Sequence, residues 1–268
     1  MSSRSVRLTD RDREILAFAA EHRLVLELQV QRLVRVGPGR ILSRLGALVE
    51  QGYLAKGSVD GSRHYRIRAR GLATIGSSLR VPKDKLGAYG HDVGLAWLWL
   101  AARDGMFGPL HETVSERRMR SHDRPIDRSV DPFGVRNGGY DRFGNERLHY
   151  PDLLLIDPYG RRLALELELS SKGRERTEVI IGGYGADPRI DRVLYLVEAH
   201  QTGYRIRRSL EQTVREMGLS DRIRFQLIEP FSSRGDGRGG ARERNAARSR
   251  NSTPLQAAPL RAPAETGR

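Results

Sequence analysis

Residues 162–170, RLALELELS, are the segment that most constrains how this chain can fold. Their strict alternation is typical of a β-strand, because successive side chains of a strand point to opposite faces of the sheet. One face would carry four leucines, and the other would carry Glu166 and Glu168. Such a strand must lay its apolar face on a core and hold the two carboxylates side by side on the other face.

The segments around this strand alternate between helix and strand patterns. We expect helices at 91–103, 174–184 and 206–217, and strands at 113–120 (centred on Glu116), 151–157, 192–198 and 223–228. The Gly-, Asp- and Arg-rich stretch 121–147 predicts a loop. This order predicts an α/β domain with a mixed sheet over residues 91–230, within an α+β protein.

Asp152 supplies a third carboxylate, at the start of the strand before Glu166. If a hairpin joins the two strands, Asp152, Glu166 and Glu168 converge and repel one another unless a cation lies between them. Hard oxygen ligands of this kind suit Mg²⁺ or Mn²⁺. In the alternative interpretation the glutamates line the wet face of an edge strand, and Pro151-Asp152 is ordinary turn chemistry. His149 precedes Pro151-Asp152 and could lie near the carboxylates, but we expect it at the surface.

Residues 8–79 predict a second compact unit, separated from the first by a polar linker at 80–90. Thr9 is a good helix N-cap, further helices are expected at 26–34 and 40–51, and an Asp60-Gly61 turn would join two short strands. The outer surface of the third helix and the second strand would carry polar and basic residues suited to DNA: Arg40, Ser43, Arg44, Arg63, His64, Arg66 and Arg68. The alternative is that these residues are only solvated.

The strings LSRLGALVEQGYLAKG and RHYRIRARGLATIG give residues 8–76 a resemblance to the winged helix-turn-helix domains of bacterial regulators. That resemblance implies binding of double-stranded DNA.

The second unit resembles the PD-(D/E)xK nuclease superfamily, which has the restriction-endonuclease-like fold. In this resemblance Asp152 is the motif aspartate, Glu166 is the motif acid, and Glu116 matches an additional acid near the first strand. The three carboxylates would hold the metal ion. Glu168 stands where the motif has its lysine, and Lys172 could supply that charge from a displaced position.

Together the two units are similar to the replication-relaxation family of plasmids and integrative elements. The order of elements and the sequence around Pro151-Asp152, Glu166 and Tyr184 carry the similarity. It implies handling of mobile-element DNA, with replication or transfer proteins as possible partners. A homodimer is also compatible with it.

Composition narrows the classes of function. The chain has 47 Lys and Arg against 33 Asp and Glu, a net charge of +14, which favours a polyanionic partner. It has no cysteine and no apolar run long enough for a membrane helix, so we expect a cytoplasmic protein without membrane contact. No phosphate-binding loop or nucleophile elbow is present. Residues 231–268 form an arginine-rich, polar tail that predicts disorder.

Three functions remain open. The first is a DNA-binding protein of a mobile element, acting in replication, relaxation or transfer, with a degenerate nuclease-like domain. The second is an active Mg²⁺-dependent endonuclease or nickase that uses Asp152, Glu166, Glu168 and Lys172. The third is a winged-helix transcriptional regulator whose second domain binds a ligand or a partner.

Overall fold

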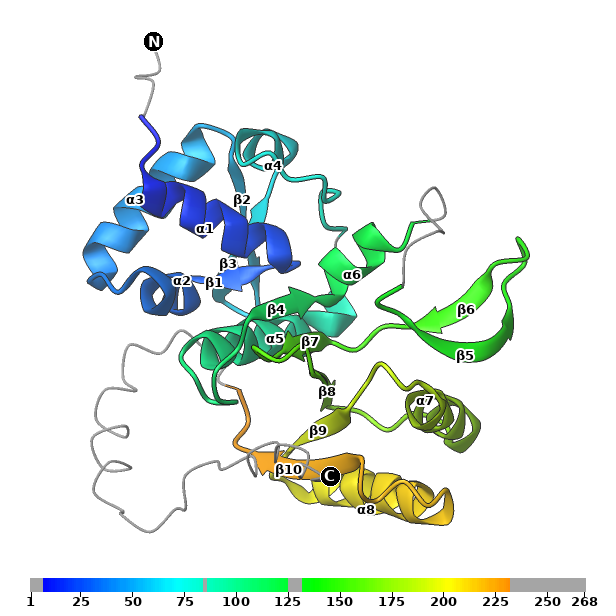
Figure 1. The fold of residues 1–268 in the computed structure, drawn as a ribbon. Coiled ribbons are helices and arrows are strands. Elements are labelled where there is room, and N and C mark those ends of the chain that lie inside the picture. Colours follow the sequence, from blue (N-terminus) through cyan, green and yellow to red (C-terminus); the bar gives the residue numbers. More distant parts are fainter. Residues whose placement is uncertain (1–6, 84–85, 125–131, 232–268) are drawn as a thin grey trace, which may run out of the picture.

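The structure of the protein, a computed structural model, describes residues 7–83, 86–124 and 132–231. Within these ranges the chain forms eight α-helices and ten strands, in an α+β arrangement with a mixed five-stranded sheet (Figure 1). The predicted tail lies outside the described residues except for Phe231. No helix in the described ranges is long and apolar enough to cross a membrane.

The N-terminal elements are four helices and a three-stranded sheet. In chain order they are α1 (Asp10–Glu21), β1 (Val25–Leu26), α2 (Glu27–Val34), α3 (Pro38–Glu50), β2 (Leu54–Val59), β3 (Ser62–Ile67) and α4 (Ala69–Thr74). Thr9 caps α1 through a capping box with Asp12. Asp60 and Gly61 both have positive φ, as a tight β2–β3 hairpin requires. The sheet order is β1-β3-β2.

The remaining elements build the larger sheet. They are η1 (Leu86–Ala88), α5 (Tyr89–Arg103), β4 (Glu112–Ser115), α6 (Glu116–His122), β5 (Val135–Tyr140), β6 (Glu146–His149), β7 (Leu153–Ile156), β8 (Arg162–Glu168), α7 (Arg174–Ala186), β9 (Arg192–Glu198), α8 (Gln201–Glu216) and β10 (Ile223–Ile228). The strand order is β10-β9-β8-β7-β4. β4, β7 and β8 pair antiparallel, whereas β8, β9 and β10 pair parallel.

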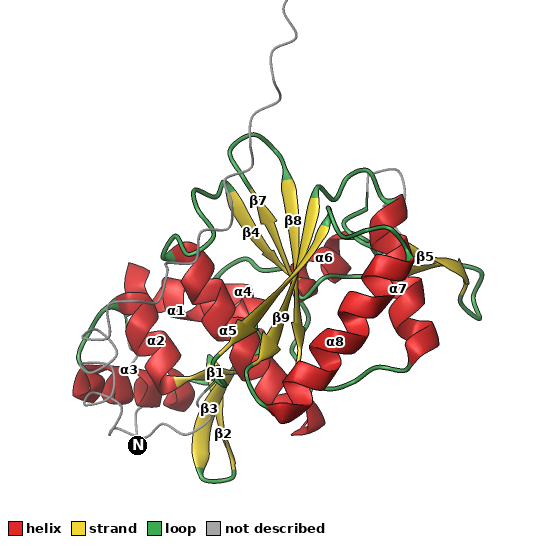
Figure 2. Cartoon of the chain, turned by 90° about the horizontal axis from the view of Figure 1, so that it is seen from below, coloured by secondary structure: helices red, strands yellow, loops and turns green. Residues whose placement is uncertain are grey.

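Strand β8 lies in the middle of this sheet, and its two faces meet different helices. Leu165 and Leu167 pack in an apolar cluster with α5. Ala164 belongs to the cluster formed with α7 and α8 on the other face. Figure 2 shows α7 and α8 on one side of the sheet and α5, backed by the N-terminal helices, on the other. The predicted alternation of β8 is therefore present, and the edge-strand interpretation is wrong because β8 has a neighbour on each side.

Helix α5 joins the two parts of the protein. Ala96 and Leu100 are buried in the N-terminal core, whereas Leu95 and Leu98 are buried against the sheet. At Gly94 the helix comes so close to β8 that an added Cβ would lie 2.5 Å from a methyl carbon of Leu167. The two cores therefore share one helix, and the sheet is positioned relative to the N-terminal elements by close packing.

Two local predictions in the second part are corrected by the structure. The predicted strand 113–120 ends at Ser115, whose Oγ accepts a hydrogen bond from the Arg118 backbone N–H at 3.2 Å and caps α6. Glu116 therefore begins a helix, where a carboxylate is favoured. The stretch predicted as a loop contains the β5–β6 hairpin. Its glycines Gly138 and Gly139 have positive φ at a break in the strand register, which is a typical use of glycine in strands.

Candidate carboxylate site

The three predicted carboxylates meet at one end of β7 and β8. Asp152 immediately precedes β7, and its backbone N–H donates to the Leu165 carbonyl at 3.1 Å. Its Oδ2 accepts a hydrogen bond from the Leu167 backbone N–H at 2.8 Å, so Asp152 bridges the two strands. Glu166 and Glu168 are only 2% and 4% exposed. Buried carboxylates need compensating donors or charges, and each of the three has at least one.

Glu166 is held by two aromatic donors that come from different elements. Its Oε1 lies 2.7 Å from His149 Nε2, and the same oxygen accepts a short hydrogen bond from the Tyr184 hydroxyl. Burial opposes ionisation of Glu166. The charges of His149 and Lys172 and these hydrogen bonds outweigh it, so the pKa of Glu166 is lowered. Glu166 is therefore ionised and fixed in position.

Glu168 forms an ion pair with Lys172, the lysine that the sequence placed at a displaced position. Lys172 Nζ lies 2.6 Å from Glu168 Oε2. Burial, together with the charges of Glu166 and Asp152, keeps the pKa of Glu168 above its ordinary value despite this partner. Burial would lower the pKa of Lys172, but the charges of Glu166 and Glu168 raise it. The lysine therefore stays protonated beside the carboxylates.

Asp152 is paired with His91, at the start of α5. His91 Nε2 lies 3.1 Å from Asp152 Oδ2. Burial disfavours a charged imidazole, yet the hydrogen bond and the charge of Asp152 raise the pKa of His91 to about 9. The pKa of Asp152 is raised, because its burial and the charge of Glu166 outweigh the help from His91. His91 and Asp152 are therefore an ion pair within a site that has a surplus of acid.

Sequence reasoning did not assign His91, His149 or Tyr184 to this site. The prediction of a surface position for His149 is wrong, since its side chain is mostly buried beside Glu166. The proximity of His149 to Pro151-Asp152 in the chain was the available signal. His91 and Tyr184 lie 61 and 18 residues from their carboxylate partners, and no local pattern links them.

The fourth predicted acid, Glu116, makes other contacts. Its carboxylate lies 2.7 Å from Arg120 Nε and 3.2 Å from Arg23 Nη2. Burial is outweighed by these two arginines, and the pKa of Glu116 is lowered. Arg23 also lies 3.5 Å from Asp92 at the start of α5. Glu116 thus ties α6 to the N-terminal elements instead of joining the three carboxylates.

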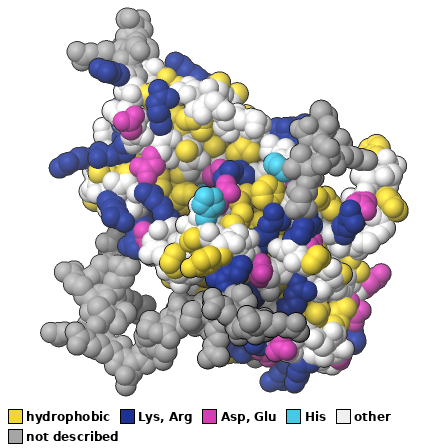
Figure 3. Space-filling view, in the orientation of Figure 1, with side chains coloured by type: hydrophobic (Ala, Val, Ile, Leu, Met, Phe, Trp, Pro, Cys, Tyr) yellow, Lys and Arg dark blue, Asp and Glu magenta, His cyan; other side chains and the backbone are white. Residues whose placement is uncertain are grey.

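The predicted DNA-binding residues differ in accessibility. Arg40 and Ser43 on α3 and Arg63 and Arg68 at β3 are exposed, and Arg66 is half-buried. Arg44 is bound by both oxygens of the buried Asp12, with Nε 2.5 Å from Oδ1. Figure 3 shows Lys and Arg side chains spread over the visible face of the molecule.

His64 was predicted to point outward from the hairpin, but its side chain is buried. It is buried over Gly57, its partner on β2, where an added Cβ would lie 2.4 Å from His64 Nε2. Tyr89 packs on the same imidazole edge-to-face, with ring centroids 5.9 Å apart. The missing side chain at Gly57 makes room for His64, and helix α5 covers it.

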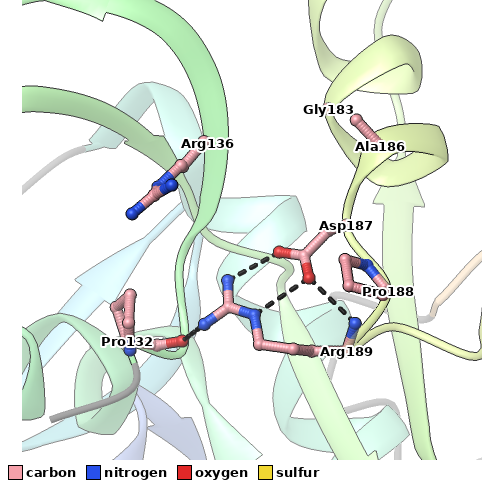
Figure 4. Close-up of a pocket in the computed structure, with 7 residues that line it drawn as sticks. All are labelled: Pro132, Arg136, Gly183, Ala186, Asp187, Pro188 and Arg189. Atoms are coloured by element: carbon pink, nitrogen blue, oxygen red, sulfur yellow. Dashed lines mark hydrogen bonds and ion pairs between the residues drawn. The ribbon is translucent and has the colours of Figure 1, made fainter.

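A hollow of about 440 Å³ lies between β5 and the end of α7 (Figure 4), and none of the three carboxylates lines it. Its wall consists of Pro132, Arg136, Gly183, Ala186, Asp187, Pro188 and Arg189. Arg189 Nη2 lies 2.6 Å from Asp187 Oδ2 and donates to the Gly134 carbonyl at 3.0 Å. At this hollow Arg189, just after α7, thus connects the end of α7 to the backbone that precedes β5.

The carboxylate oxygens are of the type that binds a hard divalent cation, but they are not arranged as a preformed metal site. The hydrogen bonds engage one oxygen each of Asp152, Glu166 and Glu168, which leaves their second oxygens as potential ligands. In the described ranges, however, no three His, Asp or Glu side chains are grouped so that they could hold a metal ion. Binding of a cation at Glu168 or Asp152 would compete with Lys172 or His91.

Comparisons with known proteins assign no function to this site. No family model matches the chain, and no curated protein matches it. A solved structure described as "PigF with SAH" is 15% identical and has a TM-score of 0.18. The similarity covers 82% of this chain but only 57% of that one, so this chain spans less than two thirds of its length. Similarity at this level carries no argument about function.

Proposed function

We propose that this chain is a DNA-binding protein of a plasmid or integrative element, acting in replication, relaxation or transfer of DNA. In this proposal the N-terminal elements are a winged helix that binds duplex DNA, and the larger sheet is a nuclease-like core. One observation carries it: the central strand β8 buries Glu166 and Glu168 beside Asp152, with Lys172 paired to Glu168 at 2.6 Å.

The winged-helix part rests on element order and surface charge. Three helices precede a β-hairpin, and α3 exposes Arg40 and Ser43 on the surface expected for a recognition helix. Arg63 and Arg68 are exposed on or next to the hairpin. Arginines in these positions suit contacts with DNA phosphates and base edges.

The nuclease-like part rests on the arrangement of acids on paired strands. The motif aspartate precedes β7, the motif acid lies on the antiparallel neighbour β8, and a helix, α7, follows. A core of purely structural function has no need of two buried acids beside a third that is mostly buried, because burying charge costs stability. This surplus of carboxylates supports a site for chemistry or for binding a cation.

Lys172 specifically favours a second candidate, a Mg²⁺- or Mn²⁺-dependent endonuclease or nickase. Asp152, Glu166 and Glu168 would hold the ion, which when bound polarises a phosphodiester and activates water. Lys172 would place a positive charge where charge develops on the phosphate. His149 and Tyr184 would fix the orientation of Glu166.

Plasmid cleavage separates the two candidates. Supercoiled plasmid is incubated with the protein and Mg²⁺ or Mn²⁺, and nicked and linear products are followed on gels. If the endonuclease candidate is right, Asp152→Asn and Lys172→Met abolish cleavage while Lys83→Met, at an exposed lysine, does not. Wild-type protein that binds plasmid without cleaving it would leave only the DNA-binding function.

Cation binding is measured separately by calorimetric titration with Mn²⁺. Wild-type protein should bind and Asp152→Asn should bind at least tenfold more weakly. Lack of binding to the wild type at millimolar Mn²⁺ would remove the metal-dependent candidate. Lack of duplex binding at low salt would contradict the DNA-binding proposal itself.

A further inference from the structure

The β5–β6 hairpin projects from the body of the molecule (Figure 1). His149, at the end of β6, contacts Glu166 at 2.7 Å. The opposite end carries two aromatic side chains, Tyr140 and Phe143, which are 64% and 72% exposed. Strand β6, from Glu146 to His149, spans about 10 Å, and the turn before it carries Phe143. The hairpin is thus an arm that links an aromatic tip to the buried acids.

The tip is built to hold its aromatic residues outward. The Asp141 carboxylate accepts hydrogen bonds from the backbone N–H groups of Phe143 and Asn145, at 2.8 and 2.9 Å. Gly144 takes a positive φ, and the Asp141 N–H donates to the Asn145 carbonyl at 2.8 Å. A turn that is internally bonded in this way leaves Phe143 in water at a cost in apolar hydration. That cost is offset if a partner covers the ring.

Arginines accompany the aromatic residues along the arm. The guanidinium of Arg142 lies 4.6 Å from the centroid of Phe143, and Arg120 on α6 lies 4.4 Å from the centroid of Tyr150. Arg136 is paired with Glu146 at 3.1 Å. Arg142 and Arg147, in contrast, have no acidic partner among the residues that the structure describes.

A groove of about 850 Å³ runs between the arm and the end of α6. Its acids are already engaged: Asp123 accepts hydrogen bonds from the backbone N–H groups of Phe133 and Gly134, Asp141 closes the turn, and Glu146 is paired. The surplus charge along the groove is therefore positive. Figure 3 shows hydrophobic and basic side chains together on the projecting arm.

We propose that the β5–β6 arm binds single-stranded DNA, with bases stacked on Tyr140 and Phe143 and phosphates on Arg142 and Arg147, and leads the strand toward the carboxylate site. Aromatic rings that alternate with arginines are the chemistry by which proteins bind unpaired bases, since every base offers a π-face. A duplex keeps its bases stacked and would gain only the phosphate contacts. The inference rests on the proposed function and names the DNA form that reaches the site.

The test uses full-length protein in EDTA, which removes divalent cations and so prevents metal-dependent cleavage of the DNA. Fluorescence anisotropy measures binding of a labelled 20-nucleotide oligo(dT) and of a 20-base-pair duplex. The double variant Tyr140→Ala/Phe143→Ala should bind oligo(dT) at least tenfold more weakly, because each stacked base contributes about 1–3 kcal/mol. Its duplex affinity should change less than twofold. Tyr140→Trp/Phe143→Trp should retain the affinity for oligo(dT).

Tyr159→Ala is the matched control. Tyr159 is 84% exposed and lies 5.2 Å from the Arg161 guanidinium, but it sits in the β7–β8 turn at the other end of those strands. We expect this variant to bind oligo(dT) within twofold of wild type. An equal loss in this control and in the double variant would overturn the assignment of the site to the arm.

The phosphate contacts are tested by Arg142→Ala/Arg147→Ala. The slope of log affinity for oligo(dT) against log salt should fall by about 1.4, at about 0.7 per phosphate for single strands. Oligo(dT) binding unchanged in both double variants would overturn the inference, as would an equal loss of duplex and oligo(dT) binding in Tyr140→Ala/Phe143→Ala. If duplex binding persists in that case, the proposed DNA-binding function survives and only the role of the arm is wrong.

Discussion

Buried acids are treated in opposite ways in the two parts of the protein. In the N-terminal part, Asp12 is matched by a single partner, Arg44, and by the capping residue Thr9. At the carboxylate site, Asp152, Glu166 and Glu168 lie beside one lysine and two histidines. The first is a balanced ion pair that fastens α3 to α1. The second is a cluster in which the charges of the acids act on one another.

The pKa values show what this difference means. Burial would raise the pKa of Asp12, but Arg44 and Thr9 outweigh it and the pKa is lowered, so ionised Asp12 stabilises the fold. The pKa of both Asp152 and Glu168 is raised, first by burial, so their ionised forms destabilise it. Stability explains the first arrangement. The arrangement of Asp152, Glu166 and Glu168 is better explained by function.

The largest expected effect comes from breaking the balanced pair. Arg44→Met should lower the free energy of unfolding by about 3 kcal/mol, because it leaves Asp12 buried without its partner. This is the lower end of the usual range, since the Arg44 side chain is 28% exposed. Urea denaturation measures it. The double variant Asp12→Asn/Arg44→Met should recover part of the loss, and a stable single variant would show that the pair is unimportant.

The junction between the two parts should make stability depend on pH. His22 packs against Phe18 and Trp99, with ring centroids 4.7 and 6.0 Å away. Burial and the charge of Arg117 lower its pKa to about 3. The folded state therefore holds His22 neutral. Above pH 6.5 neutral His22 contributes fully to the free energy of unfolding, and this contribution is lost as the pH falls from 6.5 toward 3.

Between pH 7 and pH 5 this group should cost the wild type about 2 kcal/mol of stability. In His22→Phe that part of the pH dependence should disappear. Urea denaturation of both proteins at the two pH values gives the difference between them, in which the other titrating groups cancel. Equal pH dependence would mean that protonated His22 is accommodated in the fold.

Relieving the surplus of acid should have a smaller effect of opposite sign. Asp152→Asn should raise the free energy of unfolding without metal by at most about 1 kcal/mol, because it removes a charge that Glu166 repels and keeps an acceptor for the Leu167 N–H, while the ion pair with His91 is lost. The comparison variant is Glu112→Gln, at a half-buried carboxylate in the ion pair with Arg118, which should change stability by less than 0.5 kcal/mol. Destabilisation of Asp152→Asn by more than 1 kcal/mol would contradict the idea of an acid surplus.

The smallest effect on stability is expected at Arg40, one turn before Arg44 on α3. Arg40 is exposed, so Arg40→Ala should change the free energy of unfolding by less than about 0.5 kcal/mol. It should instead lower the salt slope of duplex binding by about one unit, as expected for a lost phosphate contact. Unchanged duplex binding would remove α3 from the DNA surface.

Local patterns in the chain were sufficient for most elements. The alternation of 162–170 predicted a strand with its leucines on one face, and β9 and β10 match the predicted ranges 192–198 and 223–228. Asp60-Gly61 predicted the β2–β3 turn. These features follow from periods of 2 and 3.6 residues and from backbone preferences at turns, which depend on near neighbours alone. The errors at 113–120 and 121–147 came from a cap and from glycines at a register break.

The partners of the charged side chains depended on packing between distant segments. Nothing near Arg44 in the chain indicates Asp12, and nothing near Glu166 indicates Tyr184. His64 is buried because β2 has a glycine opposite it and α5 covers it. A repeat pattern sets the face on which a side chain lies, whereas the charges and donors that meet it there are set by how helices and strands pack. The chain alone therefore specifies three carboxylates on neighbouring strands, and the fold specifies what surrounds them.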